Sequence, residues 1–447
     1  MKNLRTLVDN ERGVALVMAL MILLTLTGVV LAFLSVSAFE PQISRNQSDT
    51  TRARYVADAG IEYAYDTLAT NINTWNNYLV GATCTTGAVL GTANSTLPGL
   101  PATDGTFTVR VRNDCKAGDN KFTGVAVETG GNATNDTNNK LTVTSTGTFA
   151  GTTKTITIVI TKTIVPTINA ALAFPGIQAD VNFNGSAFVI DGRDTLMSNS
   201  PGTPTGTANA VYGISVNGSL PILETQVENA LANNQTNDVR GKDETSSTNP
   251  PATTRGANTV QSDSTLTSQM VTDFAAVLKQ HADITINTSS GNTYSIRDIG
   301  GGTGAPTCSS NWSSSTCWGS TTKPKIVYIN GTLDNLNTQY TSLDVAGTSE
   351  GTGILVIENG NTDINGNFRW NGPIITTGKN VGLRYRGGGN QGVYGATIVN
   401  ELHNDGSTNL EGDIRGNANL LYSREALDLV QNLLSRRLVT TTSWTDQ

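Results

Sequence analysis

Two carboxylates in a β-rich part of the sequence, Glu358 and Asp363, are the first candidates for acid–base chemistry. A pair of carboxylates on one face of a sheet can cleave a polysaccharide, because one group protonates the leaving oxygen while the other activates water or attacks. The sequence does not fix the separation of these two groups, and charged residues at strand corners are usually solvated. We therefore expect solvated corner residues rather than a catalytic pair.

Other short motifs also favour structural roles. The segment from Asp191 to Asp194 reads DGRD and lacks the D-x-[DN]-x-[DN]-G pattern of a calcium loop, so a β-turn is expected. The glycine-rich run at 300–304 precedes no helix and contains no phosphate-binding motif, so it is expected to be a loop. His281 and His403 are isolated, and no serine-nucleophile elbow occurs. We expect no catalytic residue, no cofactor and no metal site, and hence no enzyme.

Three tryptophans stand out in polar, glycine-rich surroundings: Trp312, Trp318 and Trp370. In one interpretation, each tryptophan caps a small apolar core. In the other, they form an exposed surface that binds a glycan or a partner. Trp312 and Trp318 lie beside the loop between Cys308 and Cys317.

The longest element that the sequence predicts begins with an apolar run near the N-terminus. From Val14 to Phe39 the sequence contains no Asp, Glu, Lys or Arg. A helix rises about 1.5 Å per residue, so about 20 apolar residues cross a bilayer. We therefore predict a transmembrane segment at Val14–Phe39, with Leu24 and Gly28 in its interior.

Three interpretations of this run compete. A secretory signal peptide has a shorter apolar region followed by a small-x-small cleavage site, and no clear site of that kind follows here. The second interpretation is an ordinary single-span anchor. The third is a helix that continues beyond the membrane as part of a larger element. In the last two, Lys2, Arg5 and Arg12 predict a cytoplasmic N-terminus.

A helical pattern does continue from Pro41 to about Thr74. Small or apolar residues recur at steps of three and four, which is the spacing of one helix face. They are Ala53, Val56, Ala57, Gly60, Ile61, Ala64, Tyr65, Leu68 and Ile72. The sequence therefore predicts one long helix over residues 14–74, with Pro41 as the place where it kinks.

The residues at the start of the run resemble the class III leader of type IV pilins and type II secretion pseudopilins. The chain reads ERGVALVMAL from Glu11 and RARYVADAGIEYA from Arg52, which looks most like minor pilins of the PilX N-terminal type. The resemblance implies that a prepilin peptidase removes residues 1–13 by cutting after Gly13, and that the new N-terminal residue, Val14, is N-methylated. It covers the N-terminal part of the chain only.

One position departs from the pattern of that family. Major pilins carry a glutamate at the fifth mature position, which is thought to pair with the N-terminal amine of a neighbouring subunit, and this position is Met18 here. In the pseudopilin family, the tip subunit lacks that glutamate. The resemblance therefore favours a low-abundance priming or tip subunit over a bulk filament subunit.

The composition indicates an exported, β-rich protein. The 447 residues include 46 glycines, with only 6% aromatic and 15% charged residues, which favours turns and strands over a helical core. The net charge of −7 and the lack of a basic patch argue against a nucleic-acid partner. Because an even number of cysteines in an exported protein indicates disulfides, we expect the pairs Cys84–Cys115 and Cys308–Cys317.

After the helix, the periodicity of the sequence changes to two. Residues 75–103 are expected to be a loop, and from Gly105 onward β-branched residues alternate with polar ones. This pattern predicts about four to six antiparallel strands, one of them within Lys121–Glu128. The strands form a pilin-like β head at 75–166. The predicted fold class is therefore α+β, mostly β.

Residues 167–447 are expected to form a second β-rich domain. Between residues 325 and 399, short strands alternate with Asn-Gly dipeptides, which favour tight corners. Several β-hairpins would explain this pattern, and so would an irregular parallel β-solenoid with β-helix-like coils. The short strands and single corners favour the solenoid.

Helices are expected to interrupt this second domain. An insertion at 195–300 carries two of them, Pro221–Asn233 and Thr267–His281, on either side of a polar linker at 236–264. Both are expected to cap the open end of the solenoid. A last helix is expected at 423–438, with Ser423 as its N-cap.

These features predict a minor pilin-like subunit that enters a type IV pilus or type II secretion-type filament through its N-terminal helix. We expect a position near the tip, with a role in assembly, priming or adhesion. The expected partners are other pilins, the prepilin peptidase, the inner membrane and a surface glycan or host-cell ligand, but no nucleic acid. The protein would be single-pass in the inner membrane before assembly and at the pilus or cell surface afterwards. The alternative is a membrane-anchored β-helix protein that binds a glycan or acts on a polysaccharide, and that keeps residues 1–13.

Overall fold

The computed structural model describes residues 5–163, 165–201, 203–242, 260–301, 307–333, 339–386, 388–403 and 409–446. The chain divides into two compact units. Unit 1 consists of residues 1–161 and 440–447, and unit 2 consists of residues 162–439. Unit 2 is thus an insertion in the sequence of unit 1. The expected second domain at 167–447 is corrected at its C-terminal end, because the last residues of the chain return to unit 1.

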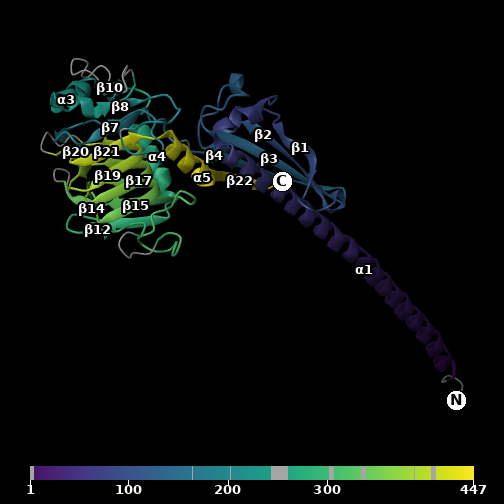
Figure 1. Ribbon diagram of the computed structural model, residues 1–447. Coiled ribbons are helices and arrows are strands. Elements are labelled where there is room, and N and C mark those ends of the chain that lie inside the picture. The colour runs from purple at the N-terminus through teal and green to yellow at the C-terminus, as the bar shows by residue number, and fades with distance from the viewer. Residues whose placement is uncertain are drawn as a thin grey trace. The chain divides into compact units, whose positions relative to one another are not determined.

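Unit 1 begins with α1 (Arg5–Thr70), a single long helix (Figure 1). The helix is continuous through Pro41, since a proline removes only one backbone donor and the flanking turns keep their hydrogen bonds. Residues 1–4 of the predicted leader lie outside the described residues, and the rest of the leader forms the first turns of α1. The long N-terminal helix that the sequence predicted is therefore confirmed, although it ends at Thr70 rather than near Thr74.

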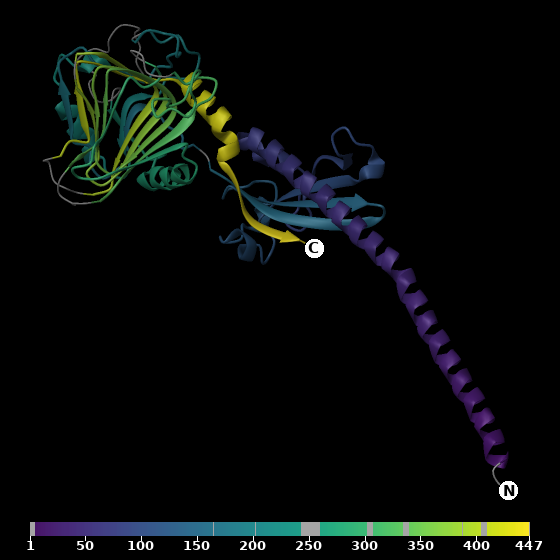
Figure 2. The same cartoon turned by 90° about the horizontal axis from the view of Figure 1, so that it is seen from below.

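The remainder of unit 1 is a five-stranded sheet in the order β1-β2-β3-β4-β22. The pairs β1–β2, β2–β3 and β3–β4 are antiparallel, as predicted for this region. The elements are η1 (Ile72–Leu79), β1 (Ala88–Thr96), η2 (Ala102–Asp104), β2 (Thr106–Asn113), α2 (Asn120–Thr123), η3 (Gly130–Asn132), β3 (Lys140–Phe149), β4 (Thr152–Lys162) and β22 (Val439–Asp446). Figure 2 shows β22 beside the other strands of this sheet.

Two predictions for unit 1 are wrong. The stretch 75–103 is not only a loop, because it contains most of η1 and the edge strand β1. Residues Lys121–Glu128 do not form a strand. They begin in the short helix α2, which ends at Gly124 with a left-handed backbone (φ 71°), and Phe122 is 49% exposed. The alternation of apolar residues misled here because the side chains do not share a buried face.

Unit 2 contains two large sheets, of eleven and six strands, and every strand pair described in them is parallel. Consecutive strands of the central region alternate between the sheets. The strands β13, β15, β17 and β19 lie in the larger sheet, and β14, β16, β18 and β20 lie in the smaller one. Figure 2 shows these strands stacked against one another. Parallel strands need a crossover between them, so the hairpin alternative is wrong.

The strands of the larger sheet are β5 (Ala170–Phe174), β7 (Val189–Asp191), β8 (Tyr212–Asn217), β9 (Val239–Arg240), β10 (Val260–Asp263), β11 (Ile284–Thr288), β13 (Lys325–Gly331), β15 (Thr348–Glu358), β17 (Asn367–Gly378), β19 (Asn390–Glu401) and β21 (Asn417–Tyr422). Those of the smaller sheet are β6 (Val181–Asn184), β12 (Tyr294–Arg297), β14 (Thr341–Ala346), β16 (Asn361–Ile364), β18 (Gly382–Tyr385) and β20 (Gly412–Arg415). The residues between the two sheets form one apolar core, which includes Val327, Leu355, Ile374 and Leu383.

Glycines explain how the long strands stack so closely. Gly353, Gly372 and Gly395 lie at one level of three neighbouring strands and have φ values of 141°, 128° and 146°. Such angles suit glycine, and a Cβ on Gly372 or Gly395 would collide with the backbone of the adjacent strand. The Asn-Gly dipeptide that ends at Gly372 therefore lies inside β17 and is not a corner. In contrast, Asn359 and Gly360 both have positive φ and form a corner, as predicted.

The predicted helices of unit 2 are present. They are α3 (Ile222–Ala230), α4 (Ser268–Gln280) and α5 (Arg424–Leu434), which continues into η7 (Ser435–Arg437); η4 (Thr236–Asp238) is an additional short turn. The Ser423 hydroxyl accepts a hydrogen bond from the Ala426 amide (3.3 Å), so the predicted N-cap is confirmed.

The positions of two of these helices refine the capping prediction. Helix α3 contacts β10 and β6, which are edge strands of the two sheets, whereas α4 packs on β13, β17 and β19. Helix α4 therefore covers a sheet face and does not cap an edge. In the predicted linker, residues 243–259 lie outside the described residues, and residues 260–263 form strand β10 instead.

Candidate functional site

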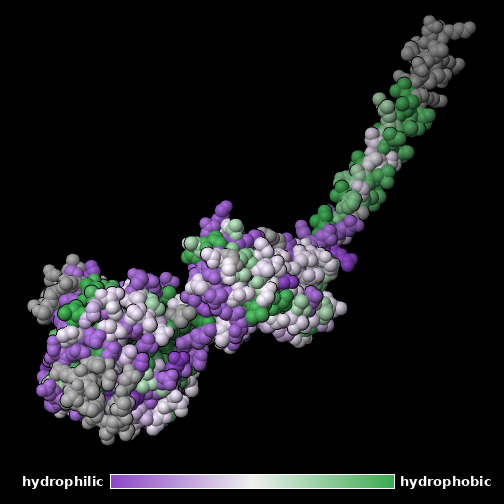
Figure 3. All heavy atoms as spheres, turned by 90° about the horizontal axis from the view of Figure 1, so that it is seen from above, coloured by the Kyte–Doolittle hydropathy of each residue, from purple (hydrophilic) through white to green (hydrophobic). Residues whose placement is uncertain are grey.

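The N-terminal half of α1 presents its apolar side chains away from the rest of the chain. Between Val14 and Phe39, the large apolar residues are between 48% exposed (Val30) and 71% exposed (Phe33). Figure 3 shows this half as a shaft covered by hydrophobic residues. By length and composition, the helix is long and apolar enough to cross a membrane. We refer to residues 14–39 as the apolar shaft.

The two threonine hydroxyl groups within the apolar shaft are satisfied by the helix itself. The Thr25 hydroxyl donates to the Met21 carbonyl (3.0 Å), and the Thr27 hydroxyl donates to the Leu23 carbonyl (2.9 Å). A lipid environment offers no water to pair with polar groups, so such back-bonding makes these threonines compatible with it. The apolar shaft thus exposes a hydrocarbon surface on which few polar groups need an outside hydrogen-bond partner.

The predicted site residues of the N-terminal region all lie on α1. Val14, Leu24 and Phe39 are 57%, 69% and 59% exposed, and a Cβ at Gly28 would meet no other atom. Met18, the position that departs from the major-pilin pattern, is 63% exposed. The geometry does not test the cleavage after Gly13 or the methylation of Val14, and both stay predictions.

The C-terminal half of α1 is buried against the sheet of unit 1. Ala53, Ala57 and Leu68 are fully buried, and the helix packs mainly on β3 and β2. A Cβ added to Gly147 of β3 would collide with the backbone of Ala53 and Ala57. The small residues that the sequence placed on one helix face therefore let the helix approach the sheet closely.

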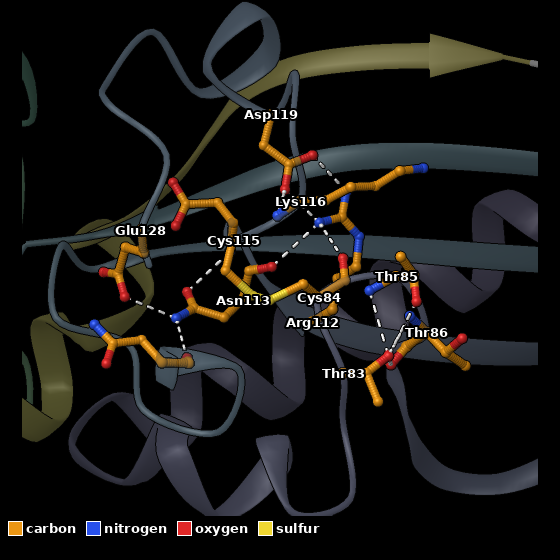
Figure 4. Close-up of a disulfide and its surroundings, with 12 residues drawn as sticks. Thr83, Cys84, Thr85, Thr86, Arg112, Asn113, Cys115, Lys116, Asp119 and Glu128 are labelled. Atoms are coloured by element: carbon orange, nitrogen blue, oxygen red, sulfur yellow. Dashed lines mark hydrogen bonds and ion pairs between the residues drawn. A yellow bond between two sulfur atoms is a disulfide. The ribbon is translucent and has the colours of Figure 1, made fainter. Parts of the chain in front are cut away.

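The disulfide Cys84–Cys115 joins the segment before β1 to the end of β2, as predicted (Figure 4). Next to it, the Arg112 guanidinium donates to both carboxylate oxygens of Asp119 (2.5 and 2.7 Å). The Asn113 amide donates to the Glu128 carboxylate (2.8 Å). These contacts hold the loop after β2 against the end of the sheet.

The Glu128 carboxylate organises the far side of the same loop. Burial raises its pKa, but the hydrogen bonds that it accepts from the Thr137 amide (2.9 Å), the Thr137 hydroxyl (2.8 Å), Asn113 and Asn138 outweigh burial, so the pKa of Glu128 is lowered overall. Burial raises the pKa of the neighbouring Asp114, despite a hydrogen bond from the Asn138 amide. The loop therefore depends on an ionised Glu128.

The second predicted disulfide, Cys308–Cys317, is also present. The structure distinguishes between the two interpretations of the three tryptophans, as core residues or as a binding surface. Trp318 and Trp370 are fully buried and meet edge to face with ring centroids 6.4 Å apart, so both are core residues. Trp312 is only partly buried and lines a cleft, so it alone keeps the binding interpretation.

The two carboxylates considered first, Glu358 and Asp363, both take part in ion pairs. Glu358 lies at the end of β15 and pairs with Lys279 (2.6 Å), whereas Asp363 lies on β16 and pairs with Arg384 (2.6 Å). These strands belong to different sheets. Each carboxylate has its own cationic partner.

The turn and metal predictions concern residues in unit 2. Asp191 pairs with Arg193 (2.8 Å), and the Asp194 carboxylate accepts hydrogen bonds from the amides of Ala208 (3.0 Å) and Arg424 (2.9 Å). Asp191 ends strand β7 and is followed by a bend at Arg193, so these contacts are structural but the predicted β-turn is not found. Within the described ranges, no three His, Cys, Asp or Glu side chains gather as metal ligands. Residues 302–304 of the glycine-rich run lie outside the described residues.

Sequence reasoning missed strand β22. It joins the edge of the unit 1 sheet next to β4, and Asp446 forms an ion pair with Arg54 of α1 (2.9 Å). The available signal was the run of β-branched residues at Thr440–Thr442 followed by Trp444. Strand β1 was missed because glycines and prolines surround it.

Comparisons with known proteins agree with the N-terminal part of this description. Residues 12–62 match the family model described as PilX N-terminal. No curated protein matches the chain. The crystal structure of the competence-associated pilin ComZ from Thermus thermophilus is similar over 90% of this chain and 98% of that chain, at 13% identity, but the TM-score of 0.25 is too low to support an argument. The exposed apolar shaft, the buried half of α1 and the family match lie on the same segment, and the similarity of residues 12–62 to the PilX N-terminal family supports a type IV minor-pilin-like protein.

Proposed function

We propose that this protein is a minor subunit that enters a type IV pilus or type II secretion-type filament through α1, near the tip of the filament, and acts in priming or adhesion. The observation that carries the proposal is the exposed apolar shaft. Apolar surface gains roughly 25 cal/mol per Å² when it leaves water, so a helix of this kind needs a bilayer or other helices around it. The proposal assigns no catalytic step to the chain.

The sequence of events begins at the inner membrane, with the N-terminus in the cytoplasm. The prepilin peptidase removes residues 1–13 after Gly13, and Val14 is methylated. The apolar shaft then leaves the bilayer and packs against the corresponding helices of other pilins. The family match and the exposed apolar surface of α1 support this order.

Two features support a position near the tip. Unit 2 adds residues 162–439 to the pilin-like unit. A filament built from many copies of this subunit would have to accommodate that mass in every copy. Met18 replaces the glutamate that bulk subunits carry in the family that the chain resembles. A subunit without that carboxylate lacks one contact for joining a growing shaft.

The proposal also includes an architecture for unit 2. We infer an irregular β-solenoid, in which each coil contributes one strand to the larger sheet and one to the smaller sheet. The parallel registers of β13–β15–β17–β19 and β14–β16–β18–β20 support this inference. Such a body offers a rigid surface for adhesion.

The first test is mass analysis of the N-terminus in cells with and without prepilin peptidase. A chain that begins at Val14 only when the peptidase is present supports the proposal. An intact Met1 in both strains contradicts it. It would instead favour the second candidate, a membrane-anchored glycan-binding protein. The partly exposed Trp312, which lines a cleft, supports that candidate.

The second test is a charge in the apolar shaft. Leu24→Glu costs about 2.5–3.5 kcal/mol for insertion at the centre of a membrane helix, so we expect the variant to be absent from purified filaments. The matched control is Leu100→Glu, because Leu100 is also an exposed leucine (47%) but lies in unit 1 outside α1. Recovery of Leu24→Glu in filaments at the level of the control would contradict assembly through α1.

A further inference from the structure

We propose that the cleft beside the Cys308–Cys317 loop of unit 2 binds a saccharide that carries a carboxylate. The proposal gives the adhesion part of the proposed function a ligand class, and its biological setting rests on that function. The cleft has a volume of about 420 Å³, which lies within the usual range of ligand sites. Its wall includes one aromatic ring, one exposed ammonium and several hydroxyl groups.

The aromatic wall is held rigidly. The disulfide closes the segment between Cys308 and Cys317, and Trp312 lies inside that segment. The buried Lys325 ammonium donates to the Trp312 carbonyl (2.7 Å) and to the Cys317 carbonyl (2.8 Å). A partly exposed tryptophan that is fixed in this way loses little conformational entropy when a ligand packs on it.

The cleft is lined by one exposed cation and by one carboxylate that has a cationic neighbour. The ammonium of the exposed Lys323 lies 4.1 Å from the centroid of the Trp312 ring, and among the described residues no carboxylate is within ion-pair distance of it. Glu350 also lines the cleft, but Arg369 lies 3.7 Å from its carboxylate and offsets its charge. Lys323 is therefore available to pair with an anion.

The remaining wall favours a polyhydroxylated ring. Thr307, Ser309 and Thr321 line the cleft, and hydroxyl groups both donate and accept hydrogen bonds. A pyranose ring matches these groups with its own hydroxyls, and its C–H face packs on an indole ring. A nucleic acid fits less well, since the cleft is lined by a single exposed cation and the chain carries a net charge of −7.

The experiment uses the full-length chain in detergent and two probes: oligogalacturonate and the same oligosaccharide fully methyl-esterified. Calorimetry measures the affinity for each. We expect saturable binding of the acid and at least fivefold weaker binding of the ester, because esterification removes the partner of Lys323. Equal affinities, or no saturable binding of the acid, would overturn the proposal.

Two variants locate the site. Trp312→Ala should weaken binding of the acid about 30-fold, as for an aromatic side chain at a binding hot spot. Lys323→Gln should weaken it about tenfold and abolish the difference between acid and ester, and Lys323→Arg should restore most of it. The control is Trp444→Ala, which removes a 47% exposed tryptophan from β22 and should change nothing.

The outcome stays decisive if Trp312→Ala fails to fold. Lys323 is exposed, so its variants are expected to fold, and amide exchange across β13 checks this for each protein. Unchanged acid affinity in Lys323→Gln would overturn the proposal, as would an equal loss in Trp444→Ala. Because binding is measured on purified protein, absence of the chain from filaments would affect the proposed function and leave this result untouched.

Discussion

Helix α1 carries apolar side chains along most of its length, but only its C-terminal half buries them. Leu68 is fully buried under the sheet of unit 1, whereas Leu24 is 69% exposed. The two leucines have the same helix propensity, but Leu24 lies in an uncharged apolar run, whereas Leu68 has polar neighbours on the exposed helix face. Among the described residues of unit 1, none buries the apolar shaft, so its apolar surface is left for a bilayer or for other helices, as the proposed function requires. One helix is therefore a core element at one end and, in the proposed function, an assembly element at the other.

Truncating one leucine in each half tests this contrast most directly. Leu68→Ala removes a buried side chain and should reduce the stability of unit 1 by about 2–5 kcal/mol. Leu24→Ala should leave that stability unchanged, because its side chain makes no contact with the folded units. Amide hydrogen exchange in β3 and β4, measured on the full chain in detergent, reports on unit 1 alone. Equal losses in the two variants would break the contrast.

Loss of the Cys84–Cys115 bridge should have the next largest effect, again on unit 1 only. The bridge closes a loop with a sequence separation of 31 residues, against 9 for Cys308–Cys317. A chain-entropy model gives about 3.7 kcal/mol for the longer loop and about 2.6 kcal/mol for the shorter one. The double replacement Cys84→Ser/Cys115→Ser should therefore increase exchange in β2 and β3 more than Cys308→Ser/Cys317→Ser changes exchange in unit 2. Membrane retention should be the same for both variants. A loss of retention would show that the stability of unit 1 affects how the apolar shaft is held in the membrane.

A smaller change sharpens the packing argument at the helix–sheet contact. Gly147→Ala places a methyl group against the backbone of Ala53 and Ala57, so α1 has to move away from β3. We expect a loss of about 1–3 kcal/mol, the usual cost of overpacking. Gly28→Ala is the matched control, because a Cβ there meets no other atom. A stability of Gly147→Ala equal to that of the control would show that the close approach is not needed.

The smallest expected effect depends on pH. The pKa of Glu128 is lowered in the folded chain, so its ionised form stabilises the loop near the Cys84–Cys115 bridge. That stabilisation is present above the ordinary pKa of 4.5 and is lost as the pH falls through the lower value in the folded state. Glu128→Gln should remove less than about 1 kcal/mol at pH 7 and flatten the acid dependence of unit 1. If the acid dependence of the stability of unit 1 is unchanged in this variant, other carboxylates cause it. The structure of the apolar shaft should not depend on pH in any variant.

Several elements were predictable because their signals are local. Helix hydrogen bonds join residues four apart, so the apolar run and the three–four pattern around Ala57 and Leu68 were enough for α1. Each disulfide joins two cysteines that follow one another in the sequence, with no other cysteine between them. The N-cap at Ser423 likewise involves only the next turn.

The predictions failed where a side chain's environment depends on distant segments. Phe122 was assigned to a strand together with Val125 and Val127, yet it is 49% exposed because the loop after β2 is organised by Glu128 and Asp119. Trp318 and Trp312 occur in similar sequence surroundings, yet one is buried against Trp370 and the other lines a cleft. Periodicity alone does not report which face of a segment meets the core.

The sequence by itself therefore determined the long helix, its apolar half and the resemblance to the PilX-type N-terminal region, because these depend on residues within a few turns of one another. Only the tertiary structure decided that the strands of unit 2 pair in parallel and that β22 returns to the sheet of unit 1. The hydroxyls of Thr161 and Thr442 are within hydrogen-bond distance (3.3 Å) although the residues are 281 positions apart. Strand pairing of this kind is specified by complementary faces and registers brought together over long distances, and no local pattern encodes which strands will meet.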